Sequence, residues 1–411
     1  MPSILGANSA SDYEISNSLR APGATNNHLS MVFDSAASDA NRRIFTFSGW
    51  IKLGNAVQFA QYYPNQKSIL LSTDAAQSTT SVGYGGYTSA NAGGFHFQDG
   101  RSGTYIETTS KFRDPSAWYH VVVRYDSTQG TASNRIFIYV NGVSQPLNYS
   151  NTNDPEVDQN TSVDFFSAGD NIDATSADSG NFVHNVNSYY NGGFDAINNS
   201  FDGYFADFHL INAQSLAPTA FGKTDDNGVW VPIKYAGSFN AHSFKLEFKQ
   251  TGASGNSSGM GADTSGQDNH FKVGVNSALA ANDVTVDTPT NNFCTGNPID
   301  VSGVDNPGDK CTFSEGNTKI VQAGSSNVVG WKASTIGIRN GKWYFEVKLP
   351  IVDYQVFGVG DATWDGQDGA ADNQFSVYID NGTETFRRGA GVAAAALSVT
   401  SSNNDIWMFA L

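Results

Sequence analysis

Basic residues and cysteines are scarce in this sequence of 411 residues. Lys and Arg number 23 against 39 Asp and Glu, so the formal net charge at pH 7 is −16. Proteins bind nucleic acid and anionic membrane surfaces through clustered Lys and Arg side chains. The charge balance therefore argues against both as partners, and it is compatible with an exposed, soluble component of a particle.

The chain also lacks long apolar segments. Its N-terminus has neither the basic stretch nor the apolar core of a secretory signal peptide, and no segment approaches transmembrane length. A cytoplasmic origin would favour free thiols, because thiols stay reduced there. The two cysteines, Cys294 and Cys311, are separated by a span that a disulfide could close, so their pairing stays open.

Helical signals are weak as well. The sequence has no sustained apolar pattern at helical spacing, and its one alanine tract, Ala393–Ala396, is too short to form a helix alone. In contrast, it holds 42 glycines, 12% aromatic residues and many Asn, Ser and Thr. This composition predicts an all-β protein, with two or more antiparallel β-sandwich domains of the jelly-roll type in tandem.

The clearest β signal is a hairpin. Residues 118–126 and 135–140 alternate in polarity, and an Asn-Gly turn signal follows at Asn141. Together with the strands predicted at 45–52 and 201–212, this hairpin resembles the laminin-G-like, concanavalin-A-type jelly roll. The resemblance implies surface recognition rather than catalysis.

The predicted strand at 204–211 alternates strictly, so each face should hold every second residue. One face would carry Tyr204, Ala206, Phe208 and Leu210, and the other Phe205, Asp207, His209 and Ile211. The strand tryptophans are expected in cores: Trp50, Trp118 and Trp343.

The chain divides into three predicted segments. Residues 1–220 form the laminin-G-like jelly roll, residues 221–290 a β extension or return strands of that sandwich, and residues 291–411 a second sandwich. Within the last segment, residues 341–347, 357–360 and 405–411 resemble strands of the SPRY β-sandwich. That family usually continues with another strand pair, so we expect the second sandwich to be incomplete at its C-terminus and the natural polypeptide to be longer.

The usual catalytic signatures are missing from the sequence, and we expect no enzyme activity. A retaining glycosidase needs two carboxylates about 5 Å apart, whereas acidic residues on clear strands, such as Asp207 and Glu346, stand singly. Calcium is the one candidate cofactor, since a nearly regular twelve-position loop begins at residue 361. Its oxygen ligands would be Asp361, Thr363, Asp365 and Asp372; the alternative is an acidic loop without metal.

Aromatic residues in predicted loops are the candidates for glycan binding. A pyranose ring has an apolar face and a polar rim, so sugars are held by aromatic stacking together with hydrogen bonds. The alternative is that these rings close the sandwich edges or contact neighbouring subunits. The candidates are Tyr62, Tyr63, Tyr84, Tyr87, Tyr189, Tyr190 and Trp364.

As a whole, the chain resembles multi-domain, lectin-like structural proteins of tailed phages. The resemblance implies a virion protein assembled in the host cytoplasm, either a tail fibre or a receptor-binding adhesin that recognises host-surface glycan or protein. It also implies other virion proteins as partners and a homo-oligomer, with a trimer favoured. The alternatives are a capsid decoration or head-fibre protein and a secreted carbohydrate-active enzyme.

Overall fold

The structure, a computed structural model, confirms the predicted all-β class. It describes residues 13–22, 27–54, 68–75, 78–85, 93–99, 104–149, 156–169, 182–187, 201–275, 277–298, 311–322, 334–338, 340–352, 355–360, 374–380, 383–388 and 395–411. In these residues the strands pair in antiparallel sheets, with short 3-10 turns between them. The chain forms two compact units, Met1–Ile299 with Phe313–Lys319, and Asp300–Thr312 with Ile320–Leu411.

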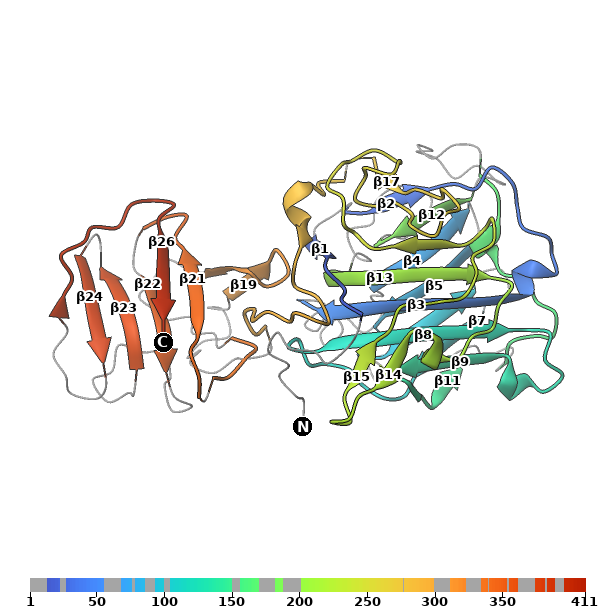
Figure 1. Ribbon diagram of the computed structural model, residues 1–411, viewed down its shortest axis with the longest axis horizontal. Coiled ribbons are helices and arrows are strands. Elements are labelled where there is room, and N and C mark those ends of the chain that lie inside the picture. The colour runs from blue at the N-terminus through green and yellow to red at the C-terminus, as the bar shows by residue number, and fades with distance from the viewer. Residues whose placement is uncertain are drawn as a thin grey trace. The chain divides into compact units, whose positions relative to one another are not determined.

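The first unit is built on two sheets, each with eight strands among the described residues (Figure 1). The first sheet has the order β10 (Val143–Ser144), β9 (Ile136–Val140), β8 (Trp118–Asp126), β3 (Ile44–Leu53), β13 (Asp202–Asn212), β1 (Ser18–Pro22) and β18 (Val284–Thr285), with β16 (Phe244–Leu246) also beside β13. The second sheet has the order β11 (Leu147–Tyr149), β7 (Thr104–Thr108), β6 (Phe95–Asp99), β5 (Ser78–Tyr84), β4 (Ser68–Ala75), β12 (Val183–Val186), β2 (Leu29–Met31) and β17 (Lys272–Val273).

Shorter elements connect or cover these sheets. A hairpin of β14 (Gly222–Thr224) and β15 (Trp230–Pro232) follows the first sheet's central strand. The 3-10 turns are η1 (Asn41–Arg43), η3 (Ala132–Asn134), η4 (Asp164–Phe166), η5 (Pro218–Ala220) and η6 (Ala281–Asp283). A second hairpin, β19 (Cys311–Ser314) with β20 (Lys319–Gln322), contains the boundary between the units. None of the described helices is long and apolar enough to span a membrane.

The main core of the first unit consists largely of aromatic rings from alternate strand positions. Phe45 and Phe47 of β3 are fully buried, and Phe45 stacks on Tyr125 of β8 with ring centroids 5.1 Å apart. Phe97 of β6 lies 5.6 Å from the same tyrosine ring. Because side chains alternate along a strand, the even-numbered residues of β3 lie on the opposite face of the sheet.

A β-bulge in β13 overturns the strict alternation predicted for 204–211. The pairing with β3 shifts between Ala206 and His209, and Asp207 adopts a left-handed backbone with φ of 49°. The extra residue changes the phase, so Phe205 and Phe208 both enter the main core. Tyr204 and Ala206 instead belong to a separate cluster on the other face.

That other face of the first sheet is covered as well. Trp50 and Trp118 pack there with Ile15 and Tyr204, which confirms that both tryptophans are buried. A neighbouring apolar cluster brings residues after β13 onto the same face of the sheet. Its buried members are Val122, Ile211, Phe221 and Tyr235.

The second unit has its own small core. Its strands are β21 (Tyr344–Lys348) paired with β26 (Ile406–Ala410), and the sheet β22 (Gln355–Gly360), β23 (Gln374–Asp380), β24 (Thr383–Arg388) and β25 (Ala395–Ala396). Val377 and Ile379 are buried beside Phe409. The prediction that Trp343 is a core residue is wrong: it precedes β21 and is 36% exposed, with its indole N–H donating to the Asn340 carbonyl.

Candidate functional site

Most site residues predicted from the sequence lie outside the described residues. This holds for the calcium loop, Asp361, Thr363, Asp365 and Asp372, and for Tyr62, Tyr63, Tyr87, Tyr189, Tyr190 and Trp364. In the part of the chain that the structure describes, no three His, Cys, Asp or Glu side chains come together as a metal site. Cys294 and Cys311 are not joined by a disulfide.

Tyr84 requires a correction, because it is neither in a loop nor exposed. It is the last residue of β5, and its ring lies in the main core with 0% exposure. The phenol O–H donates to the Phe112 carbonyl oxygen at 2.6 Å, so burial leaves its polar atom satisfied. A sugar cannot stack on a ring that is enclosed in this way.

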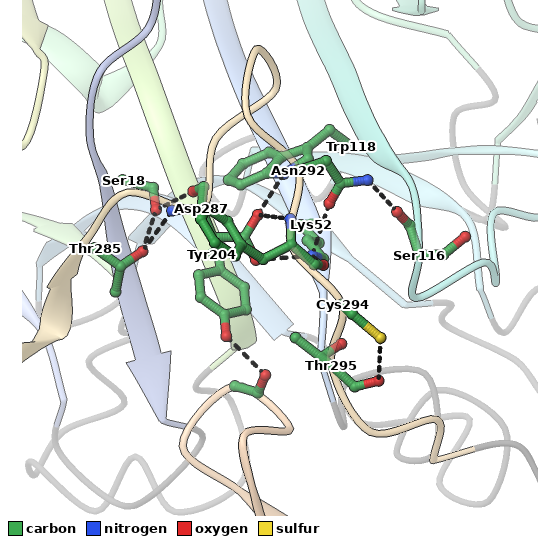
Figure 2. Close-up of polar contacts among 12 residues, drawn as sticks. Ser18, Lys52, Ser116, Trp118, Tyr204, Thr285, Asp287, Asn292, Cys294 and Thr295 are labelled. Carbon is green, nitrogen blue, oxygen red and sulfur yellow. Dashed lines mark hydrogen bonds and ion pairs between the residues drawn. The ribbon is translucent and has the colours of Figure 1, made fainter. Parts of the chain in front are cut away.

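One fully enclosed charged group in the described part of the chain is the ammonium of Lys52 (Figure 2). Lys52 is near the end of β3, on the face opposite the main core, and is 0% exposed. Its Nζ donates to Asp287 Oδ2 at 2.7 Å, to Asn292 Oδ1 at 2.8 Å and to the Phe293 carbonyl at 2.6 Å. Three acceptors match the three hydrogens of an ammonium group, which explains how it can be buried.

The carboxylate of Asp287 is held from its other side. Its Oδ1 accepts from the indole N–H of Trp118 at 3.1 Å and from the backbone N–H of Phe293 at 3.2 Å. Its backbone carbonyl accepts from the Ser18 hydroxyl at 2.6 Å. These bonds join the segment after β18 to three strands of the first sheet.

Tyr204 closes the group from below in Figure 2. Lys52 Nζ lies 5.6 Å from the centroid of its ring, and its hydroxyl donates to the Gly316 carbonyl at 2.8 Å. Burial lowers the pKa of Lys52 below its ordinary value, and the Asp287 carboxylate opposes that shift. Because Lys52 has no exposed surface, the groups it can react with are those of its own chain.

A Ser–His pair lies on the same face of the first sheet. Ser48 Oγ and His120 Nε2 are 2.9 Å apart, and both residues are buried. The indole N–H of Trp230 donates to His120 Nδ1 at 3.0 Å. Since an indole nitrogen can only donate, Nδ1 is the acceptor and the ring proton resides on Nε2. His120 therefore donates to Ser48 and does not serve as its base.

Asp207, at the bulge of β13, is joined to residues far away in the sequence. Lys245 Nζ lies 3.4 Å from Asp207 Oδ1 and 3.0 Å from Glu247 Oε1, and the Tyr13 hydroxyl donates to Asp207 at 3.2 Å. Burial alone would lower the pKa of Lys245, but the Asp207 carboxylate raises it above the ordinary range. Asp207 is thus not the isolated acid that its strand position suggests.

A polar row crosses the second sheet on the face opposite the main core. Its members stand directly opposite one another on six neighbouring strands, and all but the half-buried glutamine are buried. Because these hydroxyl and amide groups are buried or half-buried, the row does not form an exposed binding surface. In strand order it consists of Ser30, Asn185, Ser72, Ser81, Gln98 and Tyr105.

Two half-buried aromatic rings lie on β9, next to the short edge strand β10 of the first sheet. Phe137 and Tyr139 alternate with core residues along β9, with centroids 5.9 Å apart and planes at 22°. The Arg124 guanidinium carbon lies 5.3 Å from the Phe137 centroid, and its Nε donates to the Ser215 hydroxyl. We call Phe137, Tyr139 and Arg124 the aromatic shelf. The sequence signal for the shelf is a pair of aromatic residues at alternate positions of a predicted strand, on the face that does not enter the main core.

No protein-family model and no curated protein matches the chain. A "putative carbohydrate binding protein" from Bacteroides ovatus is 14% identical, with a TM-score of 0.37, over 63% of this chain and 58% of that one. A structure of botulinum neurotoxin type C, whose cell entry is described as dependent upon interaction with two ganglioside molecules, is 10% identical, with a TM-score of 0.25, over 92% of this chain and 71% of that one. These scores are too low to establish a shared fold or function.

Proposed function

We propose that this chain is a recognition protein that binds a host-surface glycan or protein as part of a virion, in a tail fibre or receptor-binding adhesin. The observation that supports binding is the aromatic shelf on the first sheet. It combines two half-buried rings, one of which, Tyr139, also packs against the neighbouring apolar cluster, with a guanidinium group; these are the components that recognise the apolar face and polar rim of a sugar.

The buried polar groups on the same face of the first sheet fit this proposal. Ser48 and His120 are oriented by Trp230 in a way that does not activate the serine. Lys52 is enclosed by its own chain. These groups contribute to a rigid scaffold, and a rigid scaffold limits the entropy lost when a surface site binds its ligand.

Several parts of the proposal come from the resemblance to phage proteins and are independent of the shelf. They are the virion location, assembly in a host cytoplasm, other virion proteins as partners, a trimeric state and a calcium ion at the loop beginning at residue 361. A capsid decoration or head-fibre protein is the alternative with the same domains. Locating the protein in purified virions by immunogold labelling separates the tail from the head.

Binding is tested with the recombinant chain on a glycan array and on host cells. We expect saturable binding in at least one of these assays, and reduced binding when Phe137 and Tyr139 are both replaced by Ala. The matched control is Val143→Ala on the neighbouring β10, a 63% exposed apolar residue outside the shelf. Absence of binding in both assays would refute recognition. Release of reducing ends from host polysaccharide would favour a carbohydrate-active enzyme instead.

A further inference from the structure

The Lys52 network brings an amine, an amide and a carboxylate together in an enclosed place (Figure 2). Lys52 Nζ is 2.8 Å from Asn292 Oδ1 and 2.7 Å from Asp287 Oδ2. We propose that Lys52 and Asn292 form an intramolecular isopeptide bond, with Asp287 as the proton carrier. The proposal stands on this geometry and is separate from the proposed function.

The environment favours the neutral, nucleophilic form of the lysine. Its side chain is 0% exposed, and its amine faces the Tyr204 ring at 5.6 Å. Removal from water disfavours the charged ammonium, which is how buried lysines become nucleophiles. The Asp287 carboxylate, within hydrogen-bond distance, is placed to take the proton that the ammonium must lose.

The amide of Asn292 is oriented at both ends. Its oxygen accepts from Lys52, and its Nδ2 donates to the Ser116 carbonyl at 2.7 Å. These two bonds place the amide carbon next to the amine and keep the nitrogen that must leave on the far side. Held in this way, the two groups react as parts of one molecule, and proximity alone accelerates such reactions by many orders of magnitude.

The proposed step balances without an external reagent. Asp287 takes a proton from the Lys52 ammonium, and the neutral amine attacks the Asn292 side-chain carbonyl carbon. The new C–N bond forms while the bond from that carbon to Nδ2 breaks. Nδ2 receives the proton from Asp287 and one of the two protons of the attacking amine, and it leaves as ammonium, that is, as ammonia with one further proton; the other amine proton stays on the new amide nitrogen. Asp287 ends as a carboxylate, and nothing is oxidised or reduced.

Asn292 rather than Asp287 is the electrophile, because the Asp287 side chain is an acceptor of three hydrogen bonds. Lys52, Trp118 and the Phe293 backbone all donate to it. Such bonds stabilise the ionised carboxylate, which resists attack by an amine. The new bond would join positions 240 residues apart in the sequence and fasten the segment after β18 covalently to β3.

Intact mass spectrometry of the recombinant chain, followed by peptide sequencing, tests the proposal. We expect a mass about 17 Da below the sequence mass, from loss of one ammonia. We also expect a branched peptide that joins Lys52 to Asn292. The proposal would be overturned if a folded chain, shown to be folded by its cooperative unfolding, had the full sequence mass and gave only linear peptides.

Variants exclude other sources of the same mass. Lys52→Arg and Asp287→Asn should both restore the sequence mass, because one lacks the nucleophile and the other the proton carrier. Lys245→Arg is the matched control and should keep the loss, since its lysine contacts carboxylates and a phenol. Loss of ammonia that persists in Lys52→Arg would indicate a backbone succinimide and refute the crosslink. A loss of about 18 Da with Lys52 joined to Asp287 would refute Asn292 as the electrophile.

Discussion

Lys52 and Asp287 form a buried ion pair with Nζ and Oδ2 2.7 Å apart, although 235 positions separate them in the sequence. The pair joins a central strand of the first sheet to the segment that follows its last strand. Trp118 and Phe293 complete the bonding of the carboxylate, and Asn292 completes that of the ammonium. The packing of the first unit therefore depends on contacts between its early strands and residues near its C-terminal end, 287–293.

Asp287→Ala should strongly destabilise the first unit. The variant leaves the Lys52 ammonium buried without its counter-charge and also removes the proton carrier of the proposed crosslink; breaking a buried pair alone costs about 3–5 kcal/mol. Urea unfolding followed by tryptophan fluorescence measures the change. Asp39→Ala is the control, because Asp39 pairs with Arg43 at an exposed position. Equal losses of stability in the two variants would contradict the role given to Asp287.

Acid should destabilise the first unit through its buried histidines. Burial lowers the pKa of His120 to about 3 and that of His184 to about 4, against 6.5 in an unfolded chain. Between those values the unfolded chain binds a proton that the folded chain excludes. Stability is therefore complete above pH 6.5 and falls as the pH decreases, by about 1.4 kcal/mol per pH unit for each histidine.

Replacing either histidine isolates this effect. His120→Gln should flatten the dependence of the unfolding free energy on pH between 6 and 4 by the share of one histidine, about 1.4 kcal/mol per pH unit. His184→Gln should do the same from a different position in the core. If the unfolding free energy of the wild type and of both variants changed with pH in the same way, burial would not be what keeps the two imidazole rings neutral in the folded state.

Gly222→Ala should displace the indole that orients His120. A Cβ at position 222 would lie 2.5 Å from ring atoms of Trp230, so the ring must move. We expect a loss of about 1–3 kcal/mol, as for other overpacked sites, together with a shift in tryptophan emission. Gly130→Ala is the control, since a Cβ there meets no atom within 4 Å. Unchanged emission in Gly222→Ala would contradict the close fit of Trp230.

The strands could be predicted from the sequence because their signals are local. Alternation predicted the strands β8 and β9, which pair in the structure, and the turn signal at Asn141 marks the turn that joins β9 to β10. The alternation rule failed at Asp207, because no local signal marks the residue that bulges. It failed again at Trp343, which lies immediately before the first residue of β21 and is 36% exposed.

The candidate site was less predictable, because its contacts connect distant segments. From the sequence alone, a lysine at the end of an alternating strand, such as Lys52, is expected to face solvent. Only the fold shows that residues 287–293 return to cover it. Likewise, Lys245 links Asp207 to Glu247 because β16 pairs with β13, a pairing that no pattern within either strand predicts.

The aromatic shelf predicts a specific loss of binding. Removing both rings in the Phe137→Ala, Tyr139→Ala double variant should weaken affinity at least tenfold, about 1.4 kcal/mol, because each ring contributes stacking beyond its buried area. Folding of the variant is checked by its unfolding midpoint. The single variant Val143→Ala should bind like the wild type, since its side chain is exposed outside the shelf.

The most direct test of recognition by this unit is a titration of the wild type and the shelf double variant with the glycan or host receptor selected on the array. The account predicts saturable binding by the wild type and at least tenfold weaker binding by a folded double variant. Equal affinity of the two proteins would contradict the shelf as the binding surface. No measurable affinity of the wild type for any host-surface ligand would contradict recognition itself.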